Sequence, residues 1–352
     1  LAAHRDKGTE GHPGGVPDAE AILLDVAEPL AAGLLQRLTM YKLRANVTIE
    51  AARDNTLYQN EQGAVSNGSG DYLFVGLQYL LPHHLLSALM FRITRSRLGW
   101  LKDLLIRQVI RLYRVEMGEA ANPDPAAYSS FNEFFTRALA SNARPLDRDP
   151  AAILCPADGR LSQAGVITDG RIFQAKGRDY SLLELLGGDA EWAERFAGGS
   201  FATVYLSPRD YHRIHMPVDG HLTRMTHVPG RLFSVSQSTT SAVHNLFARN
   251  ERVICQFETD NGPMIMILVG AIFVGSMETV WSGLVTPAGQ RVSSWDYGQQ
   301  AAEQVFLRKG EEMGRFNMGS TVILLTTQKV QWAKQLNHGT RVKMGQAIGA
   351  FR

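Results

Sequence analysis

A glycine followed by a serine, at positions 319 and 320, stands almost directly before the apolar run 322–325. Glycine has no Cβ, so the backbone there can form a tight, strained turn that holds the serine hydroxyl against the preceding carbonyl. A serine held in that way can attack its own peptide bond. The alternative interpretation is an ordinary turn entering a strand, because Gly-Ser pairs are frequent in turns.

Two histidines three residues apart, His212 and His215, lie in the polar segment 205–217 (YLSPRDYHRIHMP). Metal ligands occur at such spacings. No cysteine or further acidic pattern completes a metal site, so no metal is predicted. Histidine titrates near neutral pH, and beside a serine and a carboxylate it can activate the hydroxyl as a nucleophile. Both histidines are therefore candidate catalytic residues.

One carboxylate, Asp158, lies in the segment 156–159 (PADG), after the short apolar run 153–154. An aspartate followed by glycine commonly bonds its own backbone in a turn. A carboxylate is also the group that nucleophile activation by a histidine requires. Both interpretations of Asp158 stay open from the residues alone.

The segment 314–321 (GRFNMGST) resembles the self-cleavage site of the bacterial phosphatidylserine decarboxylases. The blocks around Asp158, His215 and Ser320 are similar, position by position, to the Asp/His/Ser set of that family. Further similar blocks lie at 174–177 (QAKG), 245–252 (NLFARNER) and 269–281. The resemblance runs from about residue 72 to residue 348. It departs at Met318, where many bacterial members have leucine, an apolar exchange that should be tolerated.

This resemblance implies a pyruvoyl-dependent carboxy-lyase that converts phosphatidylserine to phosphatidylethanolamine and CO2. The protein would be a zymogen that cuts itself by serinolysis between Gly319 and Ser320. Ser320 would become the pyruvoyl cofactor, at the start of an α chain of residues 320–352. The β chain, ending at Gly319, would remain associated with it. The substrate amine would form a Schiff base with the pyruvoyl ketone, so neither pyridoxal phosphate nor a metal is expected.

The resemblance also implies roles for the site residues. Asp158, His215 and Ser320 would be catalytic, with His215 acting as general base and Asp158 orienting it. His212 would contact the substrate or return a proton to its α-carbon. A purely structural, hydrogen-bonding His212 is the alternative.

Short strands and turns dominate the predicted decarboxylase domain, residues 118–352. The strand patterns fall at 160–167, 201–206, 253–257, 264–274 and 321–325, with one helix near 182–196. An aromatic stripe within 128–139 is predicted to be core. The tail 338–349 looks like a lipoyl-type β-sandwich without the attachment lysine. The predicted fold class is α+β: a mainly antiparallel β body with lipoyl-like β-sandwich features, preceded by amphipathic membrane-associating helices.

Residues 67–117 form the predicted membrane-associating segment. Residues 72–91 carry no formal charge, but Pro82 and several polar side chains would be costly inside a bilayer, so a helix pair in the interface is favoured over a spanning helix. Between 92 and 114, seven basic residues face the single acid Asp103, with apolar residues at helical spacing. Each basic residue contributes about 1 kcal/mol at an anionic membrane. A core-packed helix with a solvated basic face is the alternative.

Composition limits the partners. The formal net charge of +2 does not mark a nucleic-acid binder. Cys155 and Cys255 are far apart and are interpreted as reduced, buried thiols. The first thirty residues show no secretory signal pattern, and the expected location is peripheral, at the cytoplasmic face of the cell membrane. Residues 1–66 form an extension without an assigned role.

Two other functions remain as alternatives. One is a pyruvoyl decarboxylase of a soluble amino acid, against which the basic apolar segment argues. The other is a membrane-tethered, lipoyl-like binding module that does not cleave itself. The sequence leaves open the acyl-chain preference, homo-oligomer formation and whether the chain is cut.

Overall fold

The computed structural model describes residues 83–351, apart from 176–177, 236–238, 241–242, 273–275, 299–303 and 319. The chain divides into two units, Leu1–Ala64 and Val65–Arg352, and every described residue belongs to the second. The predicted extension 1–66 and the first part of the uncharged stretch, 72–82, lie outside the described residues. The predicted domain boundaries therefore stay predictions.

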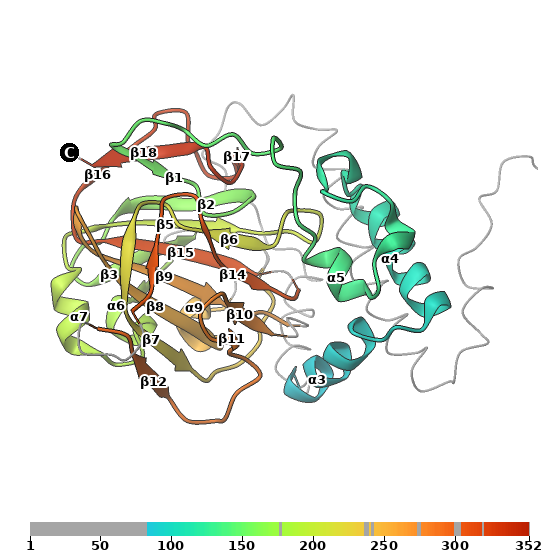
Figure 1. Cartoon of the computed structure of the whole chain (residues 1–352). Helices are drawn as coiled ribbons and strands as arrows, with labels where there is room; N and C mark the ends of the chain where they lie inside the picture. Colours follow the sequence, from blue (N-terminus) through green and yellow to red (C-terminus); the bar gives the residue numbers. More distant parts are fainter. Residues whose placement is uncertain are drawn as a thin grey trace, which may run out of the picture. The chain divides into compact units, whose positions relative to one another are not determined.

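The β body is built around a nine-stranded sheet in which every strand pair is antiparallel (Figure 1). Its strands, in spatial order, are β12 (Ser293–Asp296), β7 (Gly220–Val228), β8 (Arg252–Thr259), β9 (Gly262–Val269), β15 (Thr321–Thr326), β5 (Ser200–Tyr205), β2 (Gly159–Val166) and β17 (Arg341–Val342), and β13 (Phe306–Leu307) also pairs with β7.

Three smaller antiparallel sheets complete the body. The four-stranded one has the order β11 (Gly283–Leu284), β10 (Met277–Thr279), β14 (Glu312–Phe316) and β6 (Arg213–His215). The others are β1 (Ala152–Leu154), β18 (Ala347–Phe351) and β16 (Val330–Trp332), and the hairpin β3 (Arg171–Ala175) with β4 (Arg178–Ser181).

Strand β15 lies at the centre of the main sheet, between β5 and β9. All six of its residues are buried, as expected for a short continuous run of mostly apolar residues. Its first residue, Thr321, pairs with Tyr205 on one side and with Val269 on the other. The position of Ser320 is therefore fixed by two neighbouring strands.

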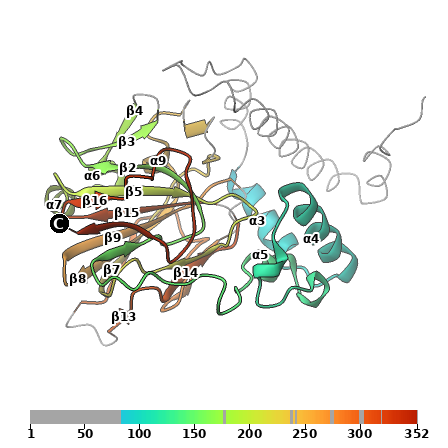
Figure 2. The same ribbon diagram turned by 90° about the horizontal axis from the view of Figure 1, so that it is seen from above.

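Helices lie on one side of this body, where α3 (His83–Thr94), α4 (Gly99–Tyr113) and α5 (Phe131–Phe135) are grouped (Figure 2). The remaining short helices are η2 (Met117–Glu119), η3 (Pro125–Ala127), α6 (Leu182–Leu185), α7 (Ala190–Arg195) and α9 (Leu246–Arg249). Ser130 caps α5 by accepting a hydrogen bond from the Glu133 amide. None of the helices in the described part of the chain has the length and apolar character needed to cross a bilayer.

The predicted fold class, α+β with mainly antiparallel sheets preceded by helices, is confirmed. The aromatic stripe is also core, since Phe131, Phe134 and Phe135 are buried. Four of the five predicted strands match observed ones to within two residues. Both cysteines are free and buried.

Two predicted elements were drawn too long. Strand β9 ends at Val269 rather than 274, because Gly270 leaves the ladder and its amide donates to the Glu251 carbonyl at 2.8 Å. The helix expected near 182–196 is two helices, α6 and α7. Gly187 and Gly188 adopt left-handed conformations, with φ of 73° and 92°, and end the first helix.

Candidate active site

Ser320 and Asp158 lie at the same end of the strands of the main sheet, and each directly precedes a strand. Tyr205 of β5 pairs with Thr321 of β15 on one side and with Arg160 of β2 on the other. The amide of Leu206 donates to the Ser320 carbonyl at 2.9 Å. The sheet thus brings together two predicted catalytic residues that are 162 positions apart (320 − 158).

Gly159 makes the close approach next to Asp158 feasible. A Cβ at this position would lie 2.2 Å from the backbone carbonyl oxygen of Tyr205. Any larger residue would push β2 away from β5 and move Asp158 with it. The Asp-Gly pair therefore serves strand packing as well as a turn.

The two histidines lie on or beside β6, which pairs with β14 in the four-stranded sheet. Phe316, the last residue of β14, donates its amide to the His212 carbonyl at 3.0 Å. The chain then passes through residues 317–320 into β15. This turn connects the strand beside the histidines to the main sheet, and Gly319 within it lies outside the described residues.

The Ser320 side chain is fully buried, and its Oγ has no hydrogen-bond partner among the described residues. Leaving a buried hydroxyl unpaired costs about 1–3 kcal/mol, and such groups in native proteins call for a functional explanation. A hydroxyl kept free of competing hydrogen bonds is available as a nucleophile.

His212 is a buried, neutral imidazole. Its Nδ1 lies 2.7 Å from the Asp210 carbonyl, to which only an Nδ1–H can donate, so Nε2 carries the lone pair. Nε2 is buried without a partner in the described part of the chain. Burial lowers the pKa of His212 to about 3, and the charge of Arg137 opposes protonation further. The ring packs on Phe135, with 4.1 Å between centroids.

His215 has partners on both ring nitrogens. Nδ1–H donates to the Gly310 carbonyl at 2.8 Å, and Nε2 accepts from the Tyr211 hydroxyl at 3.0 Å. Burial lowers the pKa of His215, while the Gly310 hydrogen bond and the charges of Glu312 and Asp158 act in the opposite direction. The pKa of both histidines is lowered, but on His215 the charges of Glu312 and Asp158 oppose the effects of burial and Arg213, whereas on His212 the charge of Arg137 adds to that of burial.

Asp158 is held by Arg144. The guanidinium Nε donates to Asp158 Oδ1 at 2.9 Å, Nη2 binds Oδ2, and the Met344 amide donates to Oδ1 at 2.8 Å. Arg144 also pairs with Glu119 at 2.5 Å, and hydrogen bonds from Arg144 and Lys343 bring the pKa of Glu119 to about 2, although burial acts in the opposite direction.

Asp158 and His215 share no hydrogen bond among the described residues. Their segments are joined through the backbone, where the His215 amide donates to the Pro156 carbonyl at 2.8 Å. In this uncut chain the Gly310 carbonyl fixes the ring of His215, and Asp158 acts on it through charge. The role of Asp158 in orienting His215 stays a prediction.

Several residues around the site were not singled out from the sequence. Arg144 lies in the charged loop 142–150, where nothing in the pattern distinguishes it from its neighbours. Tyr211 lies inside the polar histidine segment. A tyrosine hydroxyl usually finds a hydrogen-bond partner when it is buried, so a tyrosine next to a histidine could have indicated this contact. Asn317 lies between β14 and the proposed cleavage position, and its side chain hydrogen-bonds to Asn132, Ser276 and Glu278.

The chain was compared with known proteins. The sequence model of the family described as Phosphatidylserine decarboxylase matches residues 131–350, and a second, described as PSD, matches residues 73–114. The chain belongs to the phosphatidylserine decarboxylase family. Because the family consists of decarboxylases, the chain is a carboxy-lyase. The predicted family resemblance is confirmed.

Relatives in this family are similar over nearly their whole length. A phosphatidylserine decarboxylase proenzyme of Ectopseudomonas mendocina is 57% identical over 278 residues, which is 79% of this chain and 97% of the relative. Proenzymes of the same name from Bordetella pertussis and Stutzerimonas stutzeri are 56% and 55% identical, over 79% of this chain and 94% of each relative.

Proposed function

We propose that this protein is a self-cleaving decarboxylase of phosphatidylserine, producing phosphatidylethanolamine and CO2. The observation that carries the proposal is the Ser320 hydroxyl, which is buried directly before β15 and has no hydrogen-bond partner among the described residues. It lies at the end of the strands where Asp158 also lies. The printed names of the relatives, which call them proenzymes of phosphatidylserine decarboxylase, agree with it.

Self-cleavage would begin with transfer of the Ser320 hydroxyl proton to Nε2 of His215. The serine oxygen then bonds to the Gly319 carbonyl carbon, the Gly319–Ser320 C–N bond breaks, and the proton passes to the freed amine. For this step the Tyr211 hydroxyl must release Nε2. The negative charge of Asp158 favours the imidazolium that forms.

An ester now joins Gly319 to the side chain of residue 320. Removal of the α-proton of residue 320 expels the Gly319 carboxylate and leaves a dehydroalanine. One water molecule then replaces the nitrogen, which leaves as ammonia, and the new amino terminus is a ketone. The atoms balance with one water consumed, and the products are the β chain 1–319 and the α chain 320–352.

The site fits a pyruvoyl group at position 320, because residue 320 is fully buried and its side-chain oxygen is bound to no other described group. When formed, such a ketone supplies the electron sink for decarboxylating an amine-bearing substrate. Nε2 of His212 carries the lone pair, so it would first take a proton from the substrate ammonium group and then return a proton to the substrate α-carbon. A base with so low a pKa gives up a proton readily once it has taken one.

The test is the intact mass of the purified protein under denaturing conditions, together with CO2 release from phosphatidylserine vesicles and from free serine. We expect a fragment beginning at position 320 with a pyruvate-blocked amino terminus, and CO2 from the lipid. A single mass of 352 residues would favour the non-cleaving binding module. Cleavage with CO2 from serine alone would favour the soluble amino-acid decarboxylase.

Membrane attachment through α3 and α4 is the second part of the proposal. Large apolar side chains are exposed on these helices and the link between them: Leu85 at 68%, Leu89 at 40%, Leu98 at 56% and Trp100 at 57%. Five of the seven basic residues are also exposed, namely Arg92, Arg97, Arg107, Arg111 and Arg114. Apolar and basic groups together suit an anionic lipid surface. Helix α4 is also partly packed against the core, since its residues Leu105 and Ile106 are buried.

We expect the triple variant Leu85→Ser, Leu98→Ser, Trp100→Ser to bind phosphatidylserine-containing vesicles about tenfold or more weakly, because each buried apolar side chain contributes about 1.5–3 kcal/mol. Cosedimentation with vesicles measures this. The matched control is Val166→Ser, Phe173→Ser, Leu183→Ser, on β2, β3 and α6, which exchanges apolar residues that are also exposed. Equal binding of both variants would contradict a role for α3 and α4. A peripheral location at the cytoplasmic face of the membrane is part of this proposal.

A further inference from the structure

Asn317, two residues before the proposed cleavage position, is almost completely buried and uses both ends of its side chain. Its Nδ2 donates to Ser276 Oγ at 2.5 Å and to Glu278 Oε1 at 2.8 Å. Its Oδ1 accepts from Asn132 Nδ2 at 3.0 Å. The backbone amide of Asn317 donates to the Ser276 carbonyl at 3.0 Å. A rotated amide would place its oxygen against the Glu278 carboxylate and its NH2 group against the Asn132 NH2 group, so these two partners determine one orientation.

Glu278 organises the network. It lies on β10, directly opposite Arg315 of β14. Arg315 donates to Glu278 Oε2 from Nε at 2.7 Å and pairs with it through Nη2 at 2.6 Å, and Arg95 approaches Oε1 at 3.4 Å. Burial alone would raise the pKa of Glu278, but hydrogen bonds from Asn317 and Arg315 and the charges of both arginines lower it. The carboxylate therefore stays an acceptor for the Asn317 amide at neutral pH.

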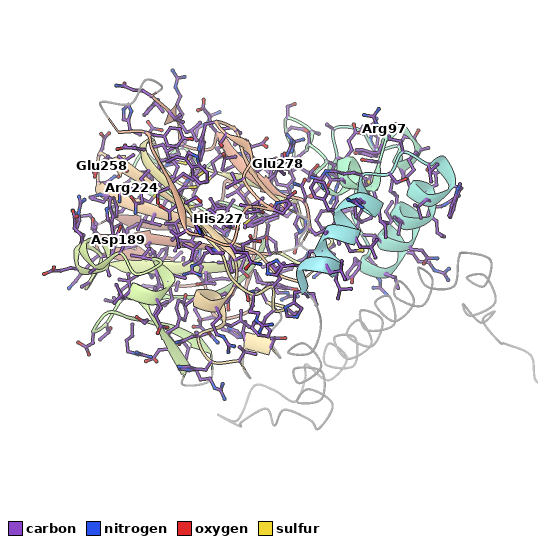
Figure 3. All side chains as sticks on the ribbon, turned by 90° about the horizontal axis from the view of Figure 1, so that it is seen from below. Arg97, Asp189, Arg224, His227, Glu258 and Glu278 are labelled. Atoms are coloured by element: carbon purple, nitrogen blue, oxygen red, sulfur yellow. The ribbon has the colours of Figure 1, made fainter. Side chains whose placement is uncertain are left out.

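Two members of the network come from the helical side of the molecule. Arg95 directly follows α3 and donates to Ser276 Oγ at 3.0 Å, while Asn132 belongs to α5. Figure 3, in which Glu278 and Arg97 are labelled, shows Glu278 on the side of the β body that faces the helices. The helical side thus contacts Asn317 directly through Asn132, and contacts Ser276, which holds Asn317, through Arg95.

We infer that Asn317, Glu278, Arg95 and Asn132 are positioning residues for self-cleavage, which hold the turn before the Gly319–Ser320 bond in the geometry of attack. The inference rests on the proposed self-cleavage. The far side of the turn is already fixed, because the Ser320 carbonyl accepts from Leu206 and β15 pairs on both sides. The chain is therefore held by hydrogen bonds on both sides of the proposed cleavage position. The helices α3 and α5 then serve maturation as well as any membrane contact.

None of these four side chains takes part in proton transfer, so their removal should affect only geometry. A displacement of about 1 Å at reacting atoms can cost about 100-fold in rate. We expect Asn317→Ala and Glu278→Gln to slow self-cleavage about 10- to 100-fold. The rate is measured from the appearance of the α chain after cell-free synthesis of the full chain. The matched controls Asn261→Ala and Glu258→Gln change exposed residues of the same types and should cleave at the wild-type rate.

Three further measurements separate positioning from folding. Self-cleavage by Asn317→Ala should keep the wild-type pH profile, because the proton-transfer groups are unchanged. Asn132→Ala should also slow cleavage, and the double variant with Asn317→Ala should be no slower than Asn317→Ala alone. In a Ser320→Ala background, where no variant can cut itself, Asn317→Ala should remain folded at the temperature of the cleavage assay, with a melting temperature lowered by only a few degrees, since unpaired buried partners cost about 1–3 kcal/mol.

Wild-type cleavage rates in Asn317→Ala and Glu278→Gln would overturn the inference while leaving the proposed function intact. A fall in melting temperature that accounts for the slower cleavage would also overturn it, since the role would then be structural. An uncut wild-type chain would remove the proposed self-cleavage itself, and this inference with it.

Discussion

We expect the Ser320→Ala variant to remain a single chain of 352 residues and to release no CO2 from phosphatidylserine. Without the hydroxyl, nothing at this position can attack the preceding carbonyl, and no ketone can form at residue 320. The loss is complete rather than partial, because nucleophile and cofactor originate from the same atoms. Denaturing electrophoresis and intact mass report cleavage, and CO2 release reports turnover.

The same variant should be at least as stable as an uncut wild-type chain. The Ser320 hydroxyl is buried without a partner among the described residues, so its removal relieves a cost of about 1–3 kcal/mol. Ser282→Ala, at an exposed site, is the matched control and should cleave normally. A Ser320→Ala chain that still separates into two would contradict the assignment of the nucleophile.

We expect the His212→Gln variant to cut itself but to lose turnover by about 100- to 10,000-fold, the range expected for removal of a general acid or base. Nε2 of His212 is unpartnered in the described part of the chain, and burial and the charge of Arg137 lower the pKa of His212, whereas the charges of Glu312 and Asp158 oppose the effect of burial on His215. Glutamine limits the cavity next to Phe135 that His212→Ala would leave. Cleavage is followed by mass and turnover by CO2 release.

Two comparisons make this result specific to His212. His215→Gln should give the opposite pattern, an uncut chain. His221→Gln, on β7 at an exposed position, should leave both steps unchanged. An uncut His212→Gln chain would transfer the role of cleavage base to His212, and full turnover would reduce His212 to a structural residue.

Local pattern was sufficient to predict much of the fold. The apolar run of β15 and the aromatic stripe of α5 are buried as the spacing indicates, since burial follows side-chain periodicity closely. The helix near 182–196 was misjudged because the amphipathic pattern continues across Gly187 and Gly188. The left-handed conformation of these two glycines ends the first helix. Glycine can adopt this conformation anywhere in a chain, so the residue type alone does not show where it occurs.

The partners of the site residues were less accessible from sequence. The Asp158, histidine and Ser320 motifs carry recognisable residue types. The salt bridge from Arg144 to Asp158 joins residues 14 positions apart in an irregular loop, and the bond from Asn132 to Asn317 spans 185 positions. Such contacts depend on how the sheets and helices pack against one another. Neither the hydrophobic periodicity nor the spacing of residues in the sequence determines them. The ring-nitrogen partners of His215, a carbonyl and a hydroxyl, are equally invisible in a motif.

Strand β15, at the middle of the main sheet, makes maturation a one-way event. A cut before residue 320 places β15, β16, β17 and β18 in the small α chain, while β5 and β9 on either side of β15 stay in the large chain. The small chain then contributes a central strand of the main sheet, and it cannot dissociate without breaking the pairing on both sides of β15. Folding must be finished before the cut, and a denatured mature enzyme, now two molecules, has lost the covalent connection that first guided the strand into place.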